Sequence, residues 1–215
     1  MSAKQFVVVE GVIGAGKTAL AEALGRAWNA RLVLEVAGQN PFLEEFYRDR
    51  RRYAFQTQVT FLLARYQQQQ DLLQHDIFSP RVVSDYLFQR DRIFANVNLA
   101  DKELILYEKL FPLLERDVPL PDLVVYLQAT TPHLVKRIQA KGRAFEKDMS
   151  EEYVAALNAA YNYFFFHYDA APVLVVDTNA LDLEANPEQA EDLFERIEEH
   201  TGGTVYYRPL GQGEG

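Results

Sequence analysis

One glycine-rich segment, residues 10–18 (E-G-V-I-G-A-G-K-T), constrains the fold of this chain more than any other feature. The apolar residues 6–9 before it predict a buried strand, and the alanine- and leucine-rich residues 19–24 after it predict a helix. The segment has the spacing G-x-x-x-x-G-K-[ST], which in a strand–loop–helix context is typical of a phosphate-binding loop. A glycine-rich turn that matched by chance would not be expected to carry both flanks. The sequence therefore predicts a binding site for a nucleoside triphosphate at this junction.

The residue types of this loop suit the chemistry of a triphosphate. Its glycines allow the backbone to curl, so that N–H groups point at phosphate oxygens, and the helix that follows adds the positive end of its dipole. Lys17 supplies a mobile cation for the outer phosphates, and the hydroxyl of Thr18 can ligate Mg²⁺. The predicted ATP-binding residues of the loop are Gly11, Gly14, Ala15, Gly16, Lys17 and Thr18.

Composition and charge exclude several other classes of protein. The chain has 215 residues, 48% of them hydrophobic, which is enough for the core of one ordinary domain and too many for a disordered chain. The net charge of −9 argues against a nucleic-acid polymer as partner, and no cysteine is present for disulfides or thiolate metal sites. No apolar run approaches the roughly 18 residues of a membrane span, and the N-terminus does not resemble a signal peptide. We expect a cytoplasmic protein with no membrane partner.

Five short apolar segments alternate with helical patterns along the chain. Each is rich in valine and leucine without strict alternation, which is typical of strands covered on both faces. The pattern predicts an α/β, P-loop kinase fold: a doubly wound, five-stranded parallel sheet with helices on both faces. Ligands of such sheets lie beyond the carboxyl ends of the strands, where Glu35, Asp85 and Asp177 are placed. The predicted strands are residues 6–10, 31–35, 81–85, 123–128 and 173–177.

A basic helix is predicted from Thr131 to Gly142. Arg137 and Lys141 are four residues apart and share one face of it, where they repel each other unless an anion lies between them. In a chain with a phosphate-binding loop this pattern favours a lid that closes over the phosphates, and an ordinary exposed basic helix is the alternative. Arg143, directly after the helix, belongs to the same predicted lid.

Further features narrow the class of nucleotide-binding protein. Asp85 could hold Mg²⁺ directly or through water, and it could also cap the helix that follows. The chain lacks the N-K-x-D motif of a guanine-reading switch and is short for a motor ATPase, which favours a small-molecule kinase. We expect residues 1–207 to form a single domain and residues 208–215 to be a disordered tail.

An ordered set of motifs resembles the deoxynucleoside kinase family, and within it the bacterial deoxyadenosine and deoxyguanosine kinases. The set spans residues 6–168 and is far more specific than the loop alone. The resemblance implies an ATP- and Mg²⁺-dependent enzyme of nucleotide salvage that phosphorylates the 5′-hydroxyl of a deoxynucleoside, with purines preferred, and that forms a homodimer. Its motifs are the phosphate-binding loop, Glu35 with Asn40-Pro41, Phe46-Tyr47, residues 55–58 (F-Q-T-Q), Asp85 with Asp91, residues 93–95 (I-F-A), Arg137, residues 141–143 (K-G-R) and Glu146.

On the acceptor side, the resemblance assigns roles that also make physical sense. Glu35 would be the general base that takes the proton of the 5′-hydroxyl, because a carboxylate suits a neutral acceptor and would repel a phosphate. Gln56 would read the edge of the base with its amide, and Phe94 would stack on the base. Tyr47 and Glu146 would hydrogen-bond the 3′-hydroxyl.

On the donor side, the resemblance assigns the lid to the phosphates. Arg137, Lys141 and Arg143 would close over them and neutralise charge in the transition state. Thr18 and Asp85 would share Mg²⁺. The predicted catalytic residues are Glu35, Lys17, Arg137 and Arg143.

The chain departs from the family pattern at the end of the third predicted strand. The family usually has Glu-Arg-Ser or Asp-Arg-Ser there, whereas this chain has D-Y-L, so a cation near the acceptor oxygen and the γ-phosphate is missing. The spacing from Asp91 to Phe94 is also one residue shorter than the commoner pattern, and Asp91 either contacts the base or pairs with a neighbouring arginine. The missing cation could come from Arg81, Arg90 or Arg92.

Two alternative functions follow from these observations. A nucleoside monophosphate kinase such as thymidylate kinase has a similar fold, but its phosphate acceptor would need an arginine where this chain has a carboxylate. A non-catalytic nucleotide-binding subunit is consistent with the missing arginine, but not with the intact phosphate-binding loop and strand-end acids.

Overall fold

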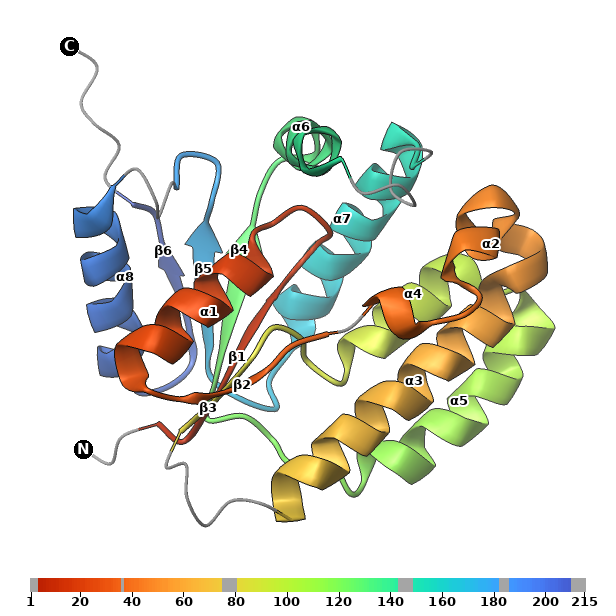
Figure 1. Ribbon diagram of the computed structural model, residues 1–215, viewed down its shortest axis with the longest axis horizontal. Coiled ribbons are helices and arrows are strands. Elements are labelled where there is room, and N and C mark those ends of the chain that lie inside the picture. The colour runs from red at the N-terminus through yellow and green to blue at the C-terminus, as the bar shows by residue number, and fades with distance from the viewer. Residues whose placement is uncertain (1–3, 36, 75–80, 143–148, 182–185, 210–215) are drawn as a thin grey trace.

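The structure is a computed structural model that describes residues 4–35, 37–74, 81–142, 149–181 and 186–209. Its strands are β1 (Phe6–Gly11), β2 (Arg31–Val33), β3 (Val82–Ser84), β4 (Leu123–Gln128), β5 (Val173–Asp177) and β6 (Thr204–Tyr207). All are parallel and form one sheet in the order β2-β3-β1-β4-β5-β6 (Figure 1). Val8 of the central strand β1 is paired with Ser84 on one side and with Val124 on the other.

The predicted α/β fold with a parallel sheet is confirmed, but the described part of the chain has six strands in this sheet and the prediction of five was wrong. The additional strand, β6, pairs with β5 at the edge of the sheet. It escaped the prediction because it has only four residues, three of them exposed, so it lacks a buried apolar run. The central strands show such a run clearly, since Val7, Val8 and Val9 are at most 1% exposed.

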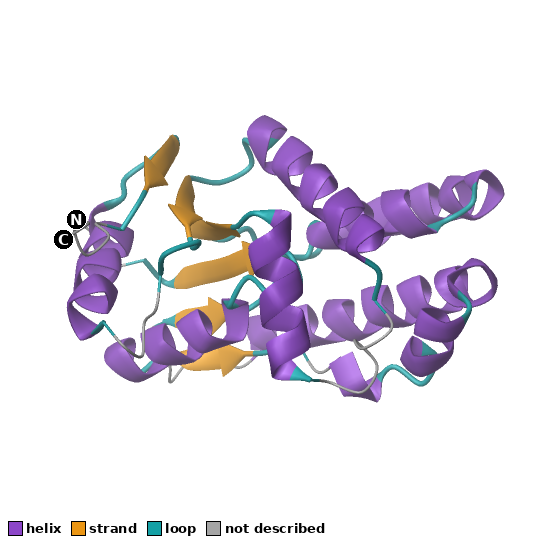
Figure 2. Cartoon of the chain, turned by 90° about the horizontal axis from the view of Figure 1, so that it is seen from above, coloured by secondary structure: helices purple, strands orange, loops and turns teal. Residues whose placement is uncertain are grey.

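Helices cover both faces of the sheet (Figures 1 and 2). Helices α1 and α8 lie on one face and α7 lies on the other, while α3, α4 and α5 form a bundle beside the sheet and α6 passes over the phosphate-binding loop. The helices are α1 (Lys17–Trp28), α2 (Leu43–Arg48), α3 (Arg50–Gln74), α4 (Arg90–Asn98), α5 (Asp101–Glu115), α6 (Thr131–Lys141), α7 (Glu151–His167) and α8 (Pro187–Glu199), with a 3₁₀ turn, η1 (Ala37–Gln39).

Local sequence signals fix the end of α6, which carries part of the predicted lid, and the start of α7, the next helix along the chain. Helix α6 ends at Gly142, whose φ of 62° lies in the left-handed region that favours glycine. Helix α7 begins after Ser150, whose hydroxyl accepts a hydrogen bond from the backbone N–H of Tyr153. None of the described helices is both long and apolar enough to cross a membrane.

Candidate active site

The loop between β1 and α1 has the geometry of a phosphate-binding loop. Gly14 and Gly16 have φ values of 85° and 100°, in the left-handed region that favours glycine. Helix α1 begins at Lys17, and no described side chain caps its first turn, so backbone N–H groups there are open to an anion. A Cβ on Gly14 would lie 3.0 Å from the carbonyl oxygen of Leu134 in α6. The loop therefore packs directly against α6.

Two residues of the predicted ATP-binding set support the loop from behind. A Cβ on Gly11 would lie 2.7 Å from the carbonyl oxygen of Leu127 in β4, so only glycine fits there. Ala15 is 3% exposed, and its N–H donates to the carbonyl oxygen of Val12 at 3.0 Å. The amine of Lys17 donates to the carbonyl oxygens of Gly11 and Val12 at 2.7 and 3.2 Å. Gly11 and Ala15 thus shape the loop without lining its pocket.

Asp85 follows β3 and joins the phosphate-binding loop to the end of the neighbouring strand. Its Oδ2 accepts a hydrogen bond from the hydroxyl of Thr18 at 2.6 Å, and its Oδ1 accepts one from the backbone N–H of Glu35 at 2.7 Å. Helix α4 begins only at Arg90, with Gln89 as its N-cap. The interpretation of Asp85 as a helix cap is therefore wrong, and its carboxylate lies beside the loop instead.

The oxygen atoms of Thr18 and Asp85 fit the ligand preference of Mg²⁺, which binds hard oxygen donors. The described residues contain no group of three histidine, cysteine, aspartate or glutamate side chains that could hold a metal by themselves. In phosphoryl-transfer enzymes the protein usually gives Mg²⁺ one or two ligands, and the phosphates and water give the rest.

Two arginines from different helices hold Glu35, which lies just beyond β2. Arg65 of α3 donates through Nε to Glu35 Oε1 at 3.0 Å and also through Nη2. Arg90 of α4 donates through Nη2 to Glu35 Oε2 at 2.5 Å. Burial raises the pKa of the Glu35 carboxyl, but the charges of Arg65 and Arg90 outweigh burial and hold that pKa well below its usual range. Glu35 is therefore ionised at neutral pH.

Asp91 lies deeper in the protein and pairs with Arg65, one of the two arginines that hold Glu35. It is fully buried, and its carboxylate accepts hydrogen bonds from Arg65, from Gln58 and, at 3.0 Å, from the hydroxyl of Tyr107. Burial raises the pKa of the Asp91 carboxyl, although Arg65 and these hydrogen bonds oppose that effect. Of the two interpretations of Asp91, the structure supports pairing with an arginine, and that arginine is Arg65.

A cavity of about 340 Å³ connects the phosphate-binding loop to the helical bundle. It has the size and the mixed polar and apolar lining that are typical of a small-molecule site. Asp91 is not part of its wall, because Gln58 and Arg65 stand in front of it. The predicted residues that do line the cavity are Gly14, Gly16, Lys17, Thr18, Glu35, Tyr47, Asp85, Phe94, Arg137 and Lys141.

The prediction placed the base-reading amide at Gln56, but the structure places Gln56 outside the cavity and a different amide, that of Gln58, in its wall. Gln56 is exposed on the outer side of α3, whereas Gln58 is 4% exposed and lines the cavity. The cause is helical geometry, because two residues turn the side chain by about 200° around the helix axis. The face of α3 toward the cavity carries Ala54, Gln58, Phe61 and Arg65 at the spacing i, i+4, i+7 and i+11.

The predicted lid is described only in part. Arg137 and Lys141 of α6 line the cavity, and Arg137 donates to the carbonyl oxygen of Thr178 at 2.5 Å and to its hydroxyl at 3.2 Å. Arg137 thus lies between the cavity and the loop after β5. Arg143 and Glu146 lie outside the described residues, so their predicted roles stay predictions.

The parallel sheet, its phosphate-binding loop and the cavity that leads from the loop to the partly buried carboxylate of Glu35 place this protein among the P-loop phosphotransferases. Two substrates can meet in such a cavity, with the phosphates held by the loop and the acceptor beside Glu35.

The chain belongs to the deoxynucleoside kinase family, whose sequence profile matches residues 7–201. Over 205 residues it is 34% identical to the deoxyguanosine kinase of Bacillus subtilis (strain 168), covering 93% of this chain and 97% of that one. Over 164 residues it is 37% identical to the deoxyadenosine kinase of Dictyostelium discoideum, covering 74% of this chain and 65% of that one. The structure of deoxyadenosine kinase from M. mycoides with bound dCTP is similar, with a TM-score of 0.77 and 26% identity over 90% of this chain and 98% of that chain. The present chain is thus a deoxynucleoside kinase, as its motifs predicted.

Proposed function

We propose that this kinase transfers the γ-phosphoryl group of ATP to the 5′-hydroxyl of a purine deoxynucleoside, in cytoplasmic nucleotide salvage. The carboxylate of Glu35 in the wall of the cavity is the observation that carries the proposal. An ionised carboxylate can accept the proton of a hydroxyl, whereas it would repel an acceptor that is already a phosphate. Purine preference is supported by relatives named as deoxyguanosine and deoxyadenosine kinases.

In the proposed reaction the protein mainly positions its substrates and neutralises charge. The loop N–H groups and Lys17 hold the β- and γ-phosphates, and Arg137 and Lys141 approach them from α6. Mg²⁺, held by Thr18 and Asp85 together with the phosphates, would supply further positive charge at the γ-phosphoryl oxygens. The 5′-oxygen attacks phosphorus as the bond to the β-phosphate oxygen breaks, ADP leaves, and the hydroxyl proton passes to Glu35.

We assign recognition of the base to Gln58 and Phe94. The Nε2 group of Gln58 is committed to Asp91, donating to its carboxylate and to its carbonyl oxygen at 3.0 Å. The Gln58 carbonyl is therefore the part of the amide that remains to accept a hydrogen bond from an amino or imino group of the base. Phe94 lines the same cavity and offers a ring for stacking. Tyr47, and Glu146 beyond the described residues, are assigned to the 3′-hydroxyl.

A substrate panel tests the proposed function directly. The protein is incubated with ATP and Mg²⁺ and with each of four deoxynucleosides and their four 5′-monophosphates, and products are identified by mass. We expect deoxyadenosine or deoxyguanosine to be the best acceptor and to yield its 5′-monophosphate. Product from the monophosphates alone would refute the proposal, and a faster reaction with pyrimidine deoxynucleosides would refute the purine preference.

We also propose a homodimer, as the family resemblance implies. Helix α5 carries Ile105, Leu106, Leu110 and Leu113, whose exposed fractions of 60%, 47%, 36% and 65% are large for apolar side chains. A second copy of the chain would cover them. Sedimentation velocity of the wild type and of Leu113→Glu tests this: we expect a dimer for the wild type and a larger monomer fraction for the variant.

A further inference from the structure

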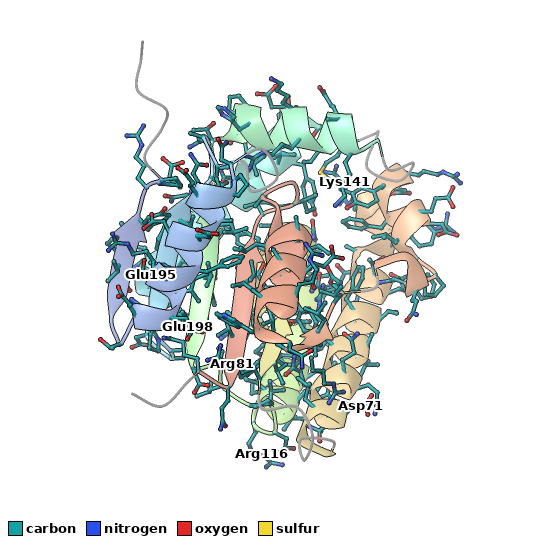
Figure 3. All side chains as sticks on the ribbon, turned by 60° about the vertical axis from the view of Figure 1, so that its left-hand side comes forward. Asp71, Arg81, Arg116, Lys141, Glu195 and Glu198 are labelled. Carbon is teal, nitrogen blue, oxygen red and sulfur yellow. The ribbon has the colours of Figure 1, made fainter. Side chains whose placement is uncertain are left out.

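The sequence left three candidates for the cation that the family places after the acid of β3, and the described contacts separate them. Arg81 precedes β3, pairs with Glu198 at 2.6 Å and lies in the half of the molecule away from Lys141 (Figure 3). Arg92 pairs with Glu108 at 3.0 Å on the outer side of α4, where 47% of its side chain is exposed. Arg90 is 4% exposed and lines the cavity. Only Arg90 of these three can contact a substrate.

The family position itself is occupied by a core residue in this chain. Tyr86 is fully buried, and its hydroxyl donates to Gln68 Oε1 at 3.0 Å and accepts a hydrogen bond from Gln69 at 3.2 Å. These contacts direct its ring toward α3. Because a tyrosine stands at this position, Asp85 has no cationic neighbour directly after it in the sequence. Arg90 enters the cavity instead from the first turn of α4.

Arg90 has more hydrogen-bond donors than the described residues use. Its Nη2 contacts Glu35, and its Nη1 lies 3.7 Å from Glu10 Oε1, too far for a hydrogen bond. Its Nε and Nη1 have no hydrogen-bond partner among the described residues although both are buried. Buried donors of a charged group are rarely left unpaired. Nη1 still faces the carboxylate of Glu10, so Nε is the donor that points to a ligand that the cavity receives.

Glu10 fixes the position of Arg90 from behind. Glu10 is fully buried at the end of β1, and its carboxylate accepts hydrogen bonds from the backbone N–H groups of Gly11 at 2.8 Å and Leu87 at 2.7 Å. Glu10 therefore ties the phosphate-binding loop to the segment that leads into α4. Its negative charge also holds the guanidinium of Arg90 toward the loop.

The ligand that would pair with Arg90 is an anion near Lys17. Arg90 and Lys17 line the same cavity, and burial followed by the positive charge of Arg90 lowers the pKa of the Lys17 amine. Two cations in the wall of one cavity stabilise an anion between them, and Lys17 is the residue that a phosphate-binding loop directs at the outer phosphates. Glu35, where the proposed function places the acceptor hydroxyl, already contacts Arg90.

We propose that Arg90 is a catalytic residue of this kinase, a role that rests on the proposed function. Its Nε group binds an oxygen of the γ-phosphoryl group while Nη2 remains on Glu35 and Nη1 stays beside Glu10. The guanidinium keeps its proton throughout: phosphorus changes its bond from the β-phosphate oxygen to the 5′-oxygen, and the hydroxyl proton goes to Glu35. Arg90 thus aligns the general base with the group being transferred and stabilises its charge, which is the task of the arginine that this chain lacks after Asp85.

The test compares Arg90→Ala with Arg92→Ala, a matched control from the same helix. We expect the kcat of Arg90→Ala to fall by about 100- to 1000-fold, as for loss of one transition-state donor, with little change in the Kd of an ATP analogue. We expect Arg92→Ala to stay within about 2-fold of the wild type, as for a surface ion pair. Added guanidinium should restore part of the lost activity of Arg90→Ala, and methylammonium should not, which a merely structural role would not produce.

Every other outcome of this test contradicts either the proposed function or the role of Arg90. A wild type that phosphorylates no deoxynucleoside would overturn the proposed function and the role of Arg90 with it. An active wild type with Arg90→Ala within several-fold of its kcat, or a slow Arg90→Ala without guanidinium rescue, would overturn the role of Arg90 alone. If Arg90→Ala does not fold, Arg90→Lys decides: we expect its kcat to fall at least about 10-fold because an ammonium cannot span two partners, and a wild-type kcat would overturn the proposal.

Discussion

Replacing Gln58 by leucine tests the proposed base contact most directly, because Gln56 offers a control two residues away in the same helix. Gln58→Leu keeps the approximate volume of the side chain and removes its amide. A neutral hydrogen bond contributes about 0.5–1.5 kcal/mol and one to a charged group about 1.5–3 kcal/mol. With a loss of about 1–2 kcal/mol at the base, kcat/KM for the nucleoside should fall about 5- to 30-fold, since about 1.4 kcal/mol corresponds to a factor of ten. The KM for ATP should not change.

The same substitution also has a predictable effect on stability. Gln58 donates to the buried carboxylate and to the carbonyl oxygen of Asp91, and losing these bonds should cost about 2 kcal/mol. At about 2–4 °C per kcal/mol for a chain of this size, Tm should fall by about 4–8 °C. Gln56→Leu, on the exposed side of α3, should change stability by at most about 0.5 kcal/mol and leave both substrates unaffected.

A substrate analogue isolates the base contact from the loss of stability. Purine 2′-deoxyriboside lacks the amino and imino donors that the Gln58 carbonyl would accept, so Gln58→Leu should lower its kcat/KM much less than that of the preferred nucleoside. Steady-state kinetics of both enzymes with both acceptors gives the interaction energy between the Gln58 amide and the donors of the base, in the same way as a double-mutant cycle. Equal losses for both acceptors, or an equal loss in Gln56→Leu, would refute the assignment of base recognition to Gln58.

Three further substitutions, the last with a matched control, test other parts of the site. Glu35→Gln should lower kcat by about 100-fold or more, as for loss of a general base, while ATP binding measured by calorimetry stays unchanged; near-normal turnover would remove Glu35 from that role. Asp85→Asn should raise the Mg²⁺ concentration needed for half-maximal activity several-fold, and an unchanged Mg²⁺ titration would contradict its assignment as a ligand. Tyr107→Phe should lower the free energy of unfolding by about 2 kcal/mol in urea because its hydroxyl bonds the Asp91 carboxylate. Tyr126→Phe, whose hydroxyl bonds the neutral Asn162, should cost about 1 kcal/mol, and equal losses in the two variants would show that the charge of Asp91 does not matter.

The parts of the site that could be predicted from sequence are those that local backbone geometry determines. The phosphate-binding loop is a contiguous motif between a strand and a helix, so its spacing alone indicated where Lys17 and Thr18 would lie. The acids after β2 and β3 were found because parallel strands bring their carboxyl ends to one edge of the sheet. Glu35 and Asp85 do meet there, through the hydrogen bond from Glu35 N–H to Asp85.

The parts that could not be predicted depend on which side of each helix faces the cavity. The face of α3 toward the cavity mixes polar and apolar residues, so hydrophobic periodicity did not show which side of this helix faces the cavity, and the family resemblance assigned the base-reading amide to Gln56. The spacing of Ala54, Gln58, Phe61 and Arg65 would have indicated a shared face, but not that this face is buried. Buried polar side chains are tolerated there because they pair with one another, as Arg65 does with Asp91.

This mutual pairing also explains why the site tolerates so much buried charge. Three carboxylates and two arginines alternate from Glu10 through Arg90, Glu35 and Arg65 to Asp91. Each buried charge has an opposite neighbour, without which its desolvation would be strongly destabilising. The alternation holds Glu35 between two guanidinium groups. Arg65 also contacts Asp91, which Gln58 bonds on the proposed base-binding side, and Arg90 also lies beside Glu10, which adjoins the phosphate-binding loop. Glu35, the proposed general base, therefore lies where the proposed binding regions for the two substrates meet, and its position depends on contacts from both.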